Sequence, residues 1–173
     1  NQRMGDLVTK LLQLAHAEQD NPELVPLDLS RLVAGEVLPF ESIVFEKGLN
    51  LQSSIENDIF IAGDKMQLQQ LTSILLDNAI SYAVPNSTIS IALWQQRSNA
   101  VLEVGNYSDN ISEEAGEHLF DRFYRADNAR TGDGGHYGLG LSIAKAVTKT
   151  HKGNIEANVS NGYVTIRFTA PMA

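Results

Sequence analysis

The apolar residues of this chain change their spacing along the sequence, and this alternation limits the possible fold more than any other feature. In residues 1–20, 28–40 and 64–79 they recur every three or four positions, which predicts amphipathic helices. In residues 88–94 apolar and polar side chains alternate instead, which predicts a strand with one buried face. The order of these segments predicts an α+β fold, in which helices cover one face of a mostly antiparallel sheet.

Caps and turns mark the ends of several elements. Asp28 and Asp64 each precede a helical pattern and are expected N-caps, while Pro39 is expected to kink or shorten the helix in which it lies. Asn161-Gly162 predicts a hairpin turn between the last two strands. The remaining elements are expected in chain order at residues 49–55, 59–62 and 101–105 (strands), 112–121 and 138–151 (helices), and 154–159 and 163–170 (strands).

The first helix has an apolar stripe that needs a partner. Its apolar residues are Met4, Leu7, Val8, Leu11, Leu12 and Ala15. One helix cannot bury such a stripe alone, so the partner is missing sequence, another chain or the domain itself. Asn21-Pro22 breaks the pattern, and residues 21–27 are expected to link this helix to a main domain at 28–173. Because the chain starts inside a helical pattern, we expect it to be part of a longer protein.

Composition excludes some classes of function. The formal net charge is −8, and a nucleic-acid binder normally presents a basic face, so we expect no nucleic-acid partner. A nucleotide site is still compatible with this charge, because a few local cations and backbone amides are enough to bind phosphates. The chain has no cysteine, which excludes disulfides and thiolate metal sites. No apolar stretch approaches the roughly 18 residues that span a bilayer.

The glycine-rich segment from Gly132 to Leu141 is one candidate for a ligand site. Glycines let the backbone approach a ligand closely, and the helix that follows offers unpaired amides and the positive end of its dipole to phosphates. No lysine directly follows Gly140, so the segment is not a P-loop, and its context is not that of a Rossmann fingerprint. Alone, such a segment is more often a plain surface loop.

Three further segments carry groups that could bind other parts of a nucleotide or its metal ion. Asn78 falls at the edge of the apolar stripe of the third helix, where its amide oxygen suits Mg²⁺, although an amide there can equally cap a nearby loop. Residues 104–111 follow a strand and can hydrogen-bond an adenine amino group or form an ordinary turn. In residues 120–125 the arginines can reach phosphates or stay solvated, and the phenylalanines suit a core.

Taken together and in this order, three segments closely resemble the catalytic ATP-binding domain of bacterial sensor histidine kinases. They are residues 75–79, 119–127 and 138–145, which match what that family calls its N, F and G2 boxes. The resemblance covers residues 3–171 and implies a Bergerat-type α/β sandwich, with ATP between the helices and a mobile lid. Residues 1–20 look like the second helix of the family's dimerisation hairpin.

The resemblance also implies how the site is built. Asn78 would ligate Mg²⁺, and Asn106 would accept a hydrogen bond from the adenine amino group. Residues 128–137 would form the lid, with two phenylalanines as its anchor, and the amides of residues 138–141 would bind phosphate. The implied nucleotide-binding residues are Asn78, Tyr82, Asn106, Ile111, Phe120, Phe123, Arg125, His136, Tyr137, Gly138, Leu139, Gly140 and Leu141.

The chain departs from the family pattern at the adenine end and in the N box. The family's adenine box usually reads Asp-x-Gly-x-Gly, and the matching positions here are Asn106, Ser108 and Asn110. With a neutral acceptor in place of a carboxylate, we expect roughly tenfold weaker binding. Ile74 and Ser81 stand where the family often has a polar residue and a lysine, so one phosphate-binding cation is missing.

The histidines do not match the phosphoacceptor of the family, which lies on the first hairpin helix and is followed by an acidic residue. His16 is read as a surface side chain near the end of what resembles the second hairpin helix, and His118, His136 and His151 are also unsuited. Residues 1–173 are therefore expected to bind nucleotide without autophosphorylation.

The intact protein is expected to work as a homodimer and to transfer the γ-phosphoryl group of ATP to a histidine of its own dimerisation and phosphotransfer domain. The phosphoryl group would then pass to the receiver domain of a response regulator. The chain would be the cytoplasmic part of a membrane sensor, and only upstream segments would reach the membrane. Two alternatives stay open: a degenerate, weakly binding or phosphatase-biased signalling module, and another ATPase of the same superfamily.

Overall fold

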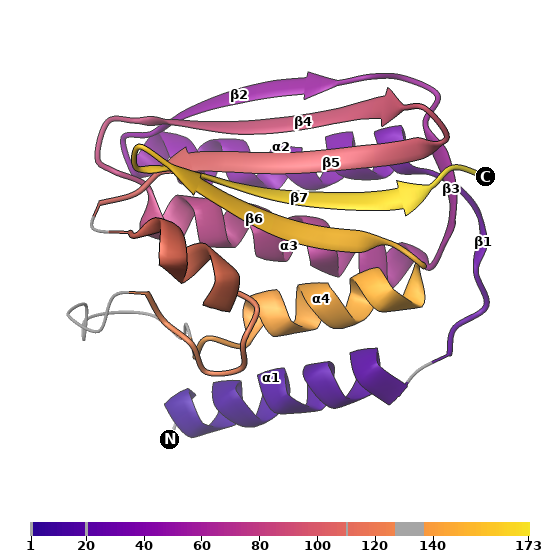
Figure 1. Ribbon diagram of the computed structural model, residues 1–173, viewed down its shortest axis with the longest axis horizontal. Coiled ribbons are helices and arrows are strands. Elements are labelled where there is room, and N and C mark those ends of the chain that lie inside the picture. Colours follow the sequence, from indigo (N-terminus) through magenta and orange to yellow (C-terminus); the bar gives the residue numbers. More distant parts are fainter. Residues whose placement is uncertain (1, 20, 110, 127–136) are drawn as a thin grey trace.

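A five-stranded sheet forms one layer of the protein, and helices cover one of its faces (Figure 1). The computed structural model describes residues 2–19, 21–109, 111–126 and 137–173. The sheet has the order β2-β4-β5-β7-β6, with β2 parallel to β4 and the other neighbours antiparallel. Its strands are β2 (Asn50–Ile55), β4 (Thr88–Gln96), β5 (Asn99–Tyr107), β6 (Asn154–Ser160) and β7 (Tyr163–Pro171). The predicted α+β fold is confirmed.

Three helices form the second layer and a fourth lies outside them. Helices α2 (Leu29–Glu46), α3 (Lys65–Tyr82) and α4 (Gly140–Thr150) lie on the same side of the sheet, and α1 (Gln2–Gln19) packs on α4 on the side away from the sheet (Figure 1). A short ribbon of β1 (Val25–Asp28) and β3 (Phe60–Gly63) and the 3₁₀ helix η1 (Glu113–His118) complete the described elements. Within these ranges no helix is long and apolar enough to cross a membrane.

The core lies between the sheet and the three helices, as the apolar spacing predicts. On β4 the side chains of Ile89, Ile91 and Leu93 are buried, and the residues between them are not. On α3 the predicted stripe is buried throughout, at Leu68, Leu71, Leu75 and Ala79. Both predicted caps are also confirmed, because Asp28 accepts from the Arg31 amide at 3.0 Å and Asp64 accepts from the Gln67 amide at 2.8 Å.

Helix α1 forms where it was predicted, but it packs on the domain with a different face. Leu14 and Ala17 are buried and Leu7 packs against the core. The other large apolar side chains of the predicted stripe are exposed: Met4, Val8, Leu11 and Leu12. The helix therefore has two apolar faces, and the domain covers only one of them.

Three elements differ from the expectation. The segment expected to be a linker contains β1, because pairing with β3 supplies hydrogen bonds that no local pattern reveals. Pro39 does not shorten α2, which continues to Glu46, since burial of Val37 and Val44 offsets the lost hydrogen bond. The helix expected at 112–121 is only a 3₁₀ helix over Glu113–His118, in which two residues are buried.

Candidate functional site

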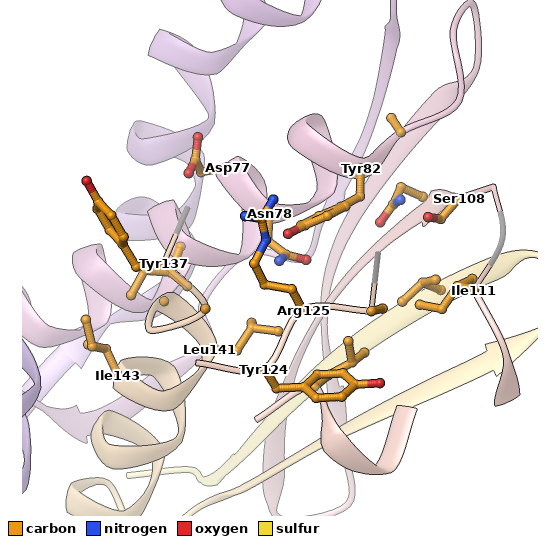
Figure 2. Close-up of a pocket in the computed structure, with 18 of the residues that line it drawn as sticks. Asp77, Asn78, Tyr82, Ser108, Ile111, Tyr124, Arg125, Tyr137, Leu141 and Ile143 are labelled. Atoms are coloured by element: carbon orange, nitrogen blue, oxygen red, sulfur yellow. The ribbon is translucent and has the colours of Figure 1, made fainter. Parts of the chain in front are cut away.

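A pocket opens between α3, the end of β5 and the start of α4 (Figure 2), and it has a volume of about 220 Å³. Residues that were predicted for the site and line it are Asn78, Tyr82, Asn106, Ile111, Arg125, Tyr137, Gly138, Gly140 and Leu141. Lining residues that sequence reasoning did not select are Lys10, Gln13, Gln70, Ser73, Ala83, Val84, Asp109, Leu119, Tyr124, Ala126, Ile143 and Val164. The pocket thus joins segments that are far apart in the sequence.

Helix α3 supplies one wall of the pocket. Because its apolar stripe faces the core, Ile74, Asn78 and Tyr82 follow one another at four-residue spacing along the neighbouring face. All three are half-buried, and Asp77 beside them is exposed. Asn78 is drawn between the two ends of the pocket, which Arg125 also lines (Figure 2). Carbonyl and carboxylate oxygens of this kind suit a hard cation.

The end of β5 holds a buried amide at the opposite end of the pocket. Asn106 is 4% exposed, and its Nδ2 donates to the carbonyl oxygen of Tyr107 at 3.1 Å. The same carbonyl accepts from the Val84 amide at 2.9 Å, which ties the end of α3 to the end of β5. No donor among the described residues binds the Asn106 amide oxygen. Asn106 lines the pocket, so this oxygen can accept a hydrogen bond from a ligand amino group.

The start of α4 is built by glycines that permit close contact. Gly138 has φ +70°, and a Cβ at this position would lie 2.7 Å from the carbonyl oxygen of Tyr124. The Phe123 amide donates to the Gly138 carbonyl at 3.0 Å. Leu139, the N-cap residue of α4, makes no side-chain capping hydrogen bond. The first amides of α4 therefore stay available to an anion beside the positive end of the helix dipole.

Three of the predicted site residues do not line the pocket, and a fourth lies outside the described residues. Phe120 is half-buried against the core, and Phe123 is 59% exposed with φ +63°, so only its backbone holds the segment to Gly138. The side chain of Leu139 is fully buried. His136 lies outside the described residues, as do most of the expected lid, residues 128–136, and Asn110.

Helix α1 closes the end of the pocket that is farthest from the end of β5. Lys10 and Gln13 line the pocket, and the Lys10 Nζ lies 5.9 Å from the ring centroid of Tyr137. The Tyr137 hydroxyl donates to the carbonyl oxygen of Arg3 at 2.5 Å. Sequence reasoning missed these residues because nothing local to α1 shows which of its faces meets the pocket.

A buried histidine outside the pocket fixes the two helices that line it. His151 follows α4 and is 3% exposed; its Nδ1 donates to the Val147 carbonyl at 2.8 Å, and its Nε2 accepts from the Asp64 amide at 3.0 Å. Burial lowers the pKa of His151, and this outweighs the opposing effects of the Val147 carbonyl and the Asp64 carboxylate. The neutral ring links the end of α4 to the start of α3. A role as phosphoacceptor does not suit a side chain so enclosed.

The arrangement can bind an elongated ligand with an amino group at one end and an anion at the other. Figure 2 shows Ser108 and Ile111 at one end and Tyr137 and Asp77 at the other. The cations among the described lining residues are Lys10 and Arg125. The amide oxygen of Asn106 and the amides of α4 complete the two ends.

The sequence pattern of the family described as "Histidine kinase-, DNA gyrase B-, and HSP90-like ATPase" matches residues 63–173. The chain is 36% identical over 172 residues to the sensor protein DltS of Streptococcus agalactiae serotype V, which covers 98% of this chain and 43% of DltS. It is 33% identical over 176 residues to the sensor histidine kinase TrcS of Mycobacterium tuberculosis, which covers 98% of this chain and 34% of TrcS.

The crystal structure of the histidine kinase ThkA in complex with the response regulator protein TrrA has a similar fold. The TM-score is 0.79 at 21% identity, and the match covers 98% of this chain and 48% of ThkA. The chain therefore spans less than half the length of each of these proteins.

Proposed function

This chain belongs to the family of histidine kinase-, DNA gyrase B-, and HSP90-like ATPases, and from this membership we propose that its pocket binds ATP with Mg²⁺ as the catalytic domain of a sensor histidine kinase. One observation carries the proposal. A single pocket brings together Asn78 of α3, the buried Asn106 of β5 and the uncapped start of α4. The degenerate alternative has less support, because the groups suited to base and phosphate line this one pocket.

The adenine ring is proposed to bind at the β5 end of the pocket. The Asn106 amide oxygen accepts from the adenine amino group, since its Nδ2 is engaged by the Tyr107 carbonyl. Tyr82, Val84 and Ile111 offer the flanking surface for the ring. Guanine carries an oxygen acceptor where adenine carries its amino group, so this orientation of the amide favours adenine.

The phosphates are proposed to bind toward α4. Its uncapped amides, the backbone at Gly138 and Gly140, and the guanidinium of Arg125 lie along this part of the pocket. Transfer of a phosphoryl group depends mainly on positioning and on neutralising charge rather than on covalent chemistry by the protein. These groups would hold the triphosphate for that transfer.

Magnesium fits the residues of this pocket. Asn78 offers an amide oxygen and Asp77 beside it a carboxylate, and in the described ranges no group of three or more metal-binding side chains could hold an ion unaided. Mg²⁺ is commonly held by one or two protein oxygens together with waters and substrate phosphates. Asn78 would hold the ion, which would supply charge neutralisation on the phosphates.

For the whole protein, we propose phosphoryl transfer to groups outside residues 1–173. The γ-phosphoryl group would pass to a histidine outside this chain, on the dimerisation and phosphotransfer domain of a homodimer, and then to the receiver domain of a response regulator. The similarity to TrcS, named as a sensor histidine kinase, and to ThkA, which was crystallised with a response regulator protein, supports this course. A cytoplasmic location is proposed on the same basis.

Calorimetric titration with ATP and MgCl₂ tests the binding step. We expect saturable binding of ATP at or below millimolar concentration and much weaker binding of GTP, which serves as the matched ligand control. The chain alone should not incorporate phosphate from ATP into itself. Absence of ATP binding at millimolar concentration, or equal binding of ATP and GTP, would contradict the proposed reading of the pocket.

A further inference from the structure

One side chain of α1 breaks the apolar face that packs on the domain. The face consists of Leu7, Lys10, Leu14 and Ala17, which follow one another at spacings of three and four residues. Leu14 and Ala17 are 3% and 5% exposed and Leu7 packs against the core, whereas Lys10 is half-buried. A lysine at such a position loses solvation of its charge unless an anion is near.

The packing of α1 carries Lys10 to one particular end of the pocket. Lys10 lines the pocket together with Gln13, one turn further along the helix. Its Nζ lies 5.9 Å from the ring centroid of Tyr137. Tyr137 and Asp77 are at the end opposite Ser108 and Ile111 (Figure 2). Through its proximity to Tyr137, Lys10 therefore belongs to the end of the pocket that lies opposite the proposed adenine position.

The described charged side chains that line the pocket are divided between its two ends. Among the described lining residues, the cations are Lys10 and Arg125 and the carboxylates are Asp77 and Asp109. Asp109 belongs to the segment after β5, at the adenine end, so Asp77 is the described carboxylate that shares the far end with Lys10. Cations and uncapped amides together can stabilise the most distal phosphate of a nucleotide.

The geometry points to Lys10 as the residue that binds the terminal phosphate of a nucleoside triphosphate, so that α1 completes the pocket and distinguishes a triphosphate from shorter nucleotides. This inference rests on the proposed ATP site and adds a specificity-determining residue to it. The cation comes from a helix outside the α/β sandwich. Packing of α1 on the domain and binding of a nucleoside triphosphate are consequently coupled, and each stabilises the other.

The test compares nucleotides of different length on one set of variants. ATP, ADP (each with MgCl₂) and AMP are titrated by calorimetry into the wild type, Lys10→Met, Lys10→Arg and Lys149→Met. Methionine keeps the length and apolar stem of the side chain, so α1 can still pack. Lys149 is an exposed lysine in the last turn of α4 and does not line the pocket.

We expect Lys10→Met to weaken ATP binding about tenfold, ADP binding by about threefold or less, and AMP binding not measurably. Lys10→Arg should keep most of the ATP affinity, and Lys149→Met should match the wild type for every nucleotide. Thermal unfolding of each variant checks that the fold is intact.

The outcomes separate this inference from the proposal on which it rests. If the wild type binds no ATP, the proposed nucleotide site is wrong and the role of Lys10 falls with it. If the wild type binds ATP and Lys10→Met binds it equally well, only the inference about Lys10 is wrong. Equal weakening for ATP, ADP and AMP would also overturn it, because Lys10 would then act through packing rather than through the third phosphate.

Discussion

Replacing Gly138 by alanine tests the close contact between Gly138, which precedes α4, and the backbone of Phe123 and Tyr124. An alanine Cβ would lie 2.7 Å from the Tyr124 carbonyl oxygen and 2.8 Å from the Phe123 carbonyl carbon, both of which are backbone atoms. The φ of +70° adds the strain of a left-handed conformation. The substitution therefore has to move the backbone at Phe123–Tyr124, or the start of α4, or both.

The magnitude follows from these two costs. The left-handed conformation costs about 1 kcal/mol for an alanine, and relieving a contact with backbone atoms costs about 1–3 kcal/mol more. We expect the free energy of unfolding to fall by about 2–4 kcal/mol in Gly138→Ala. ATP affinity should fall as well, because Tyr124 and Gly138 both line the pocket.

Gly162→Ala is the matched control. Gly162 also has a positive φ, +77°, but the nearest atom to its added Cβ is the Ser108 carbonyl oxygen at 3.5 Å, an ordinary contact. This control should lose about 1 kcal/mol or less and keep its ATP affinity. Urea unfolding, followed by the fluorescence of the one tryptophan, Trp94, gives both free energies. A difference below about 0.5 kcal/mol between the two variants would refute the tight contact at Gly138.

Three other perturbations address the remaining parts of the site and its support. Asn78→Ala should abolish the Mg²⁺ dependence of ATP binding in calorimetry, and an unchanged dependence would remove Asn78 from the metal site. Asn106→Asp removes the donor to the Tyr107 carbonyl, so the free energy of unfolding measured in urea should fall by about 1–3 kcal/mol. ATP should nevertheless bind more tightly, because the acceptor is then charged. Weaker ATP binding would mean that another group binds the adenine amino group. Because the pKa of His151 lies below its ordinary 6.5 in the folded state, the unfolded chain binds more protons, and the free energy of unfolding should decrease as the pH falls through about 6.5. His151→Gln should lose this part of the pH dependence. An identical pH profile for variant and wild type would exclude His151 as its source.

The elements with strong local signals could be predicted from the sequence. Asp64 caps α3 with its own side chain, and the apolar stripe that begins at Leu68 faces the core. Asn78 follows from that stripe, because its place in the helical period puts it at the edge of the buried face. The glycines near residue 138 predicted a break before a helix. In each case the signal lies in residues within a few positions of one another, even where the stabilising contacts are with distant segments.

Contacts between distant segments could not be predicted in this way. β1 exists because β3 pairs with it. At Gly138 the backbone packs so closely on the Tyr124 carbonyl, more than ten residues earlier in the chain, that no Cβ would fit. Phe123 looked like a buried anchor, but its side chain is 59% exposed and only its backbone amide holds Gly138. No local pattern encodes such pairings, because either partner alone has several conformations of similar free energy.

The sequence by itself determined the helices and strands other than β1 and η1, their order, and the motifs that contain Asn78 and Gly138. It could do so because caps, apolar periods and glycine conformations act over a few residues. Only the tertiary structure decided which surfaces meet. Helix α1 has two apolar faces, and it turns Leu14 and Ala17 toward the domain, which brings Lys10 into the pocket. The choice between faces depends on the apolar area that the whole domain can bury against each face. That area is set by segments that come together only when the chain has folded.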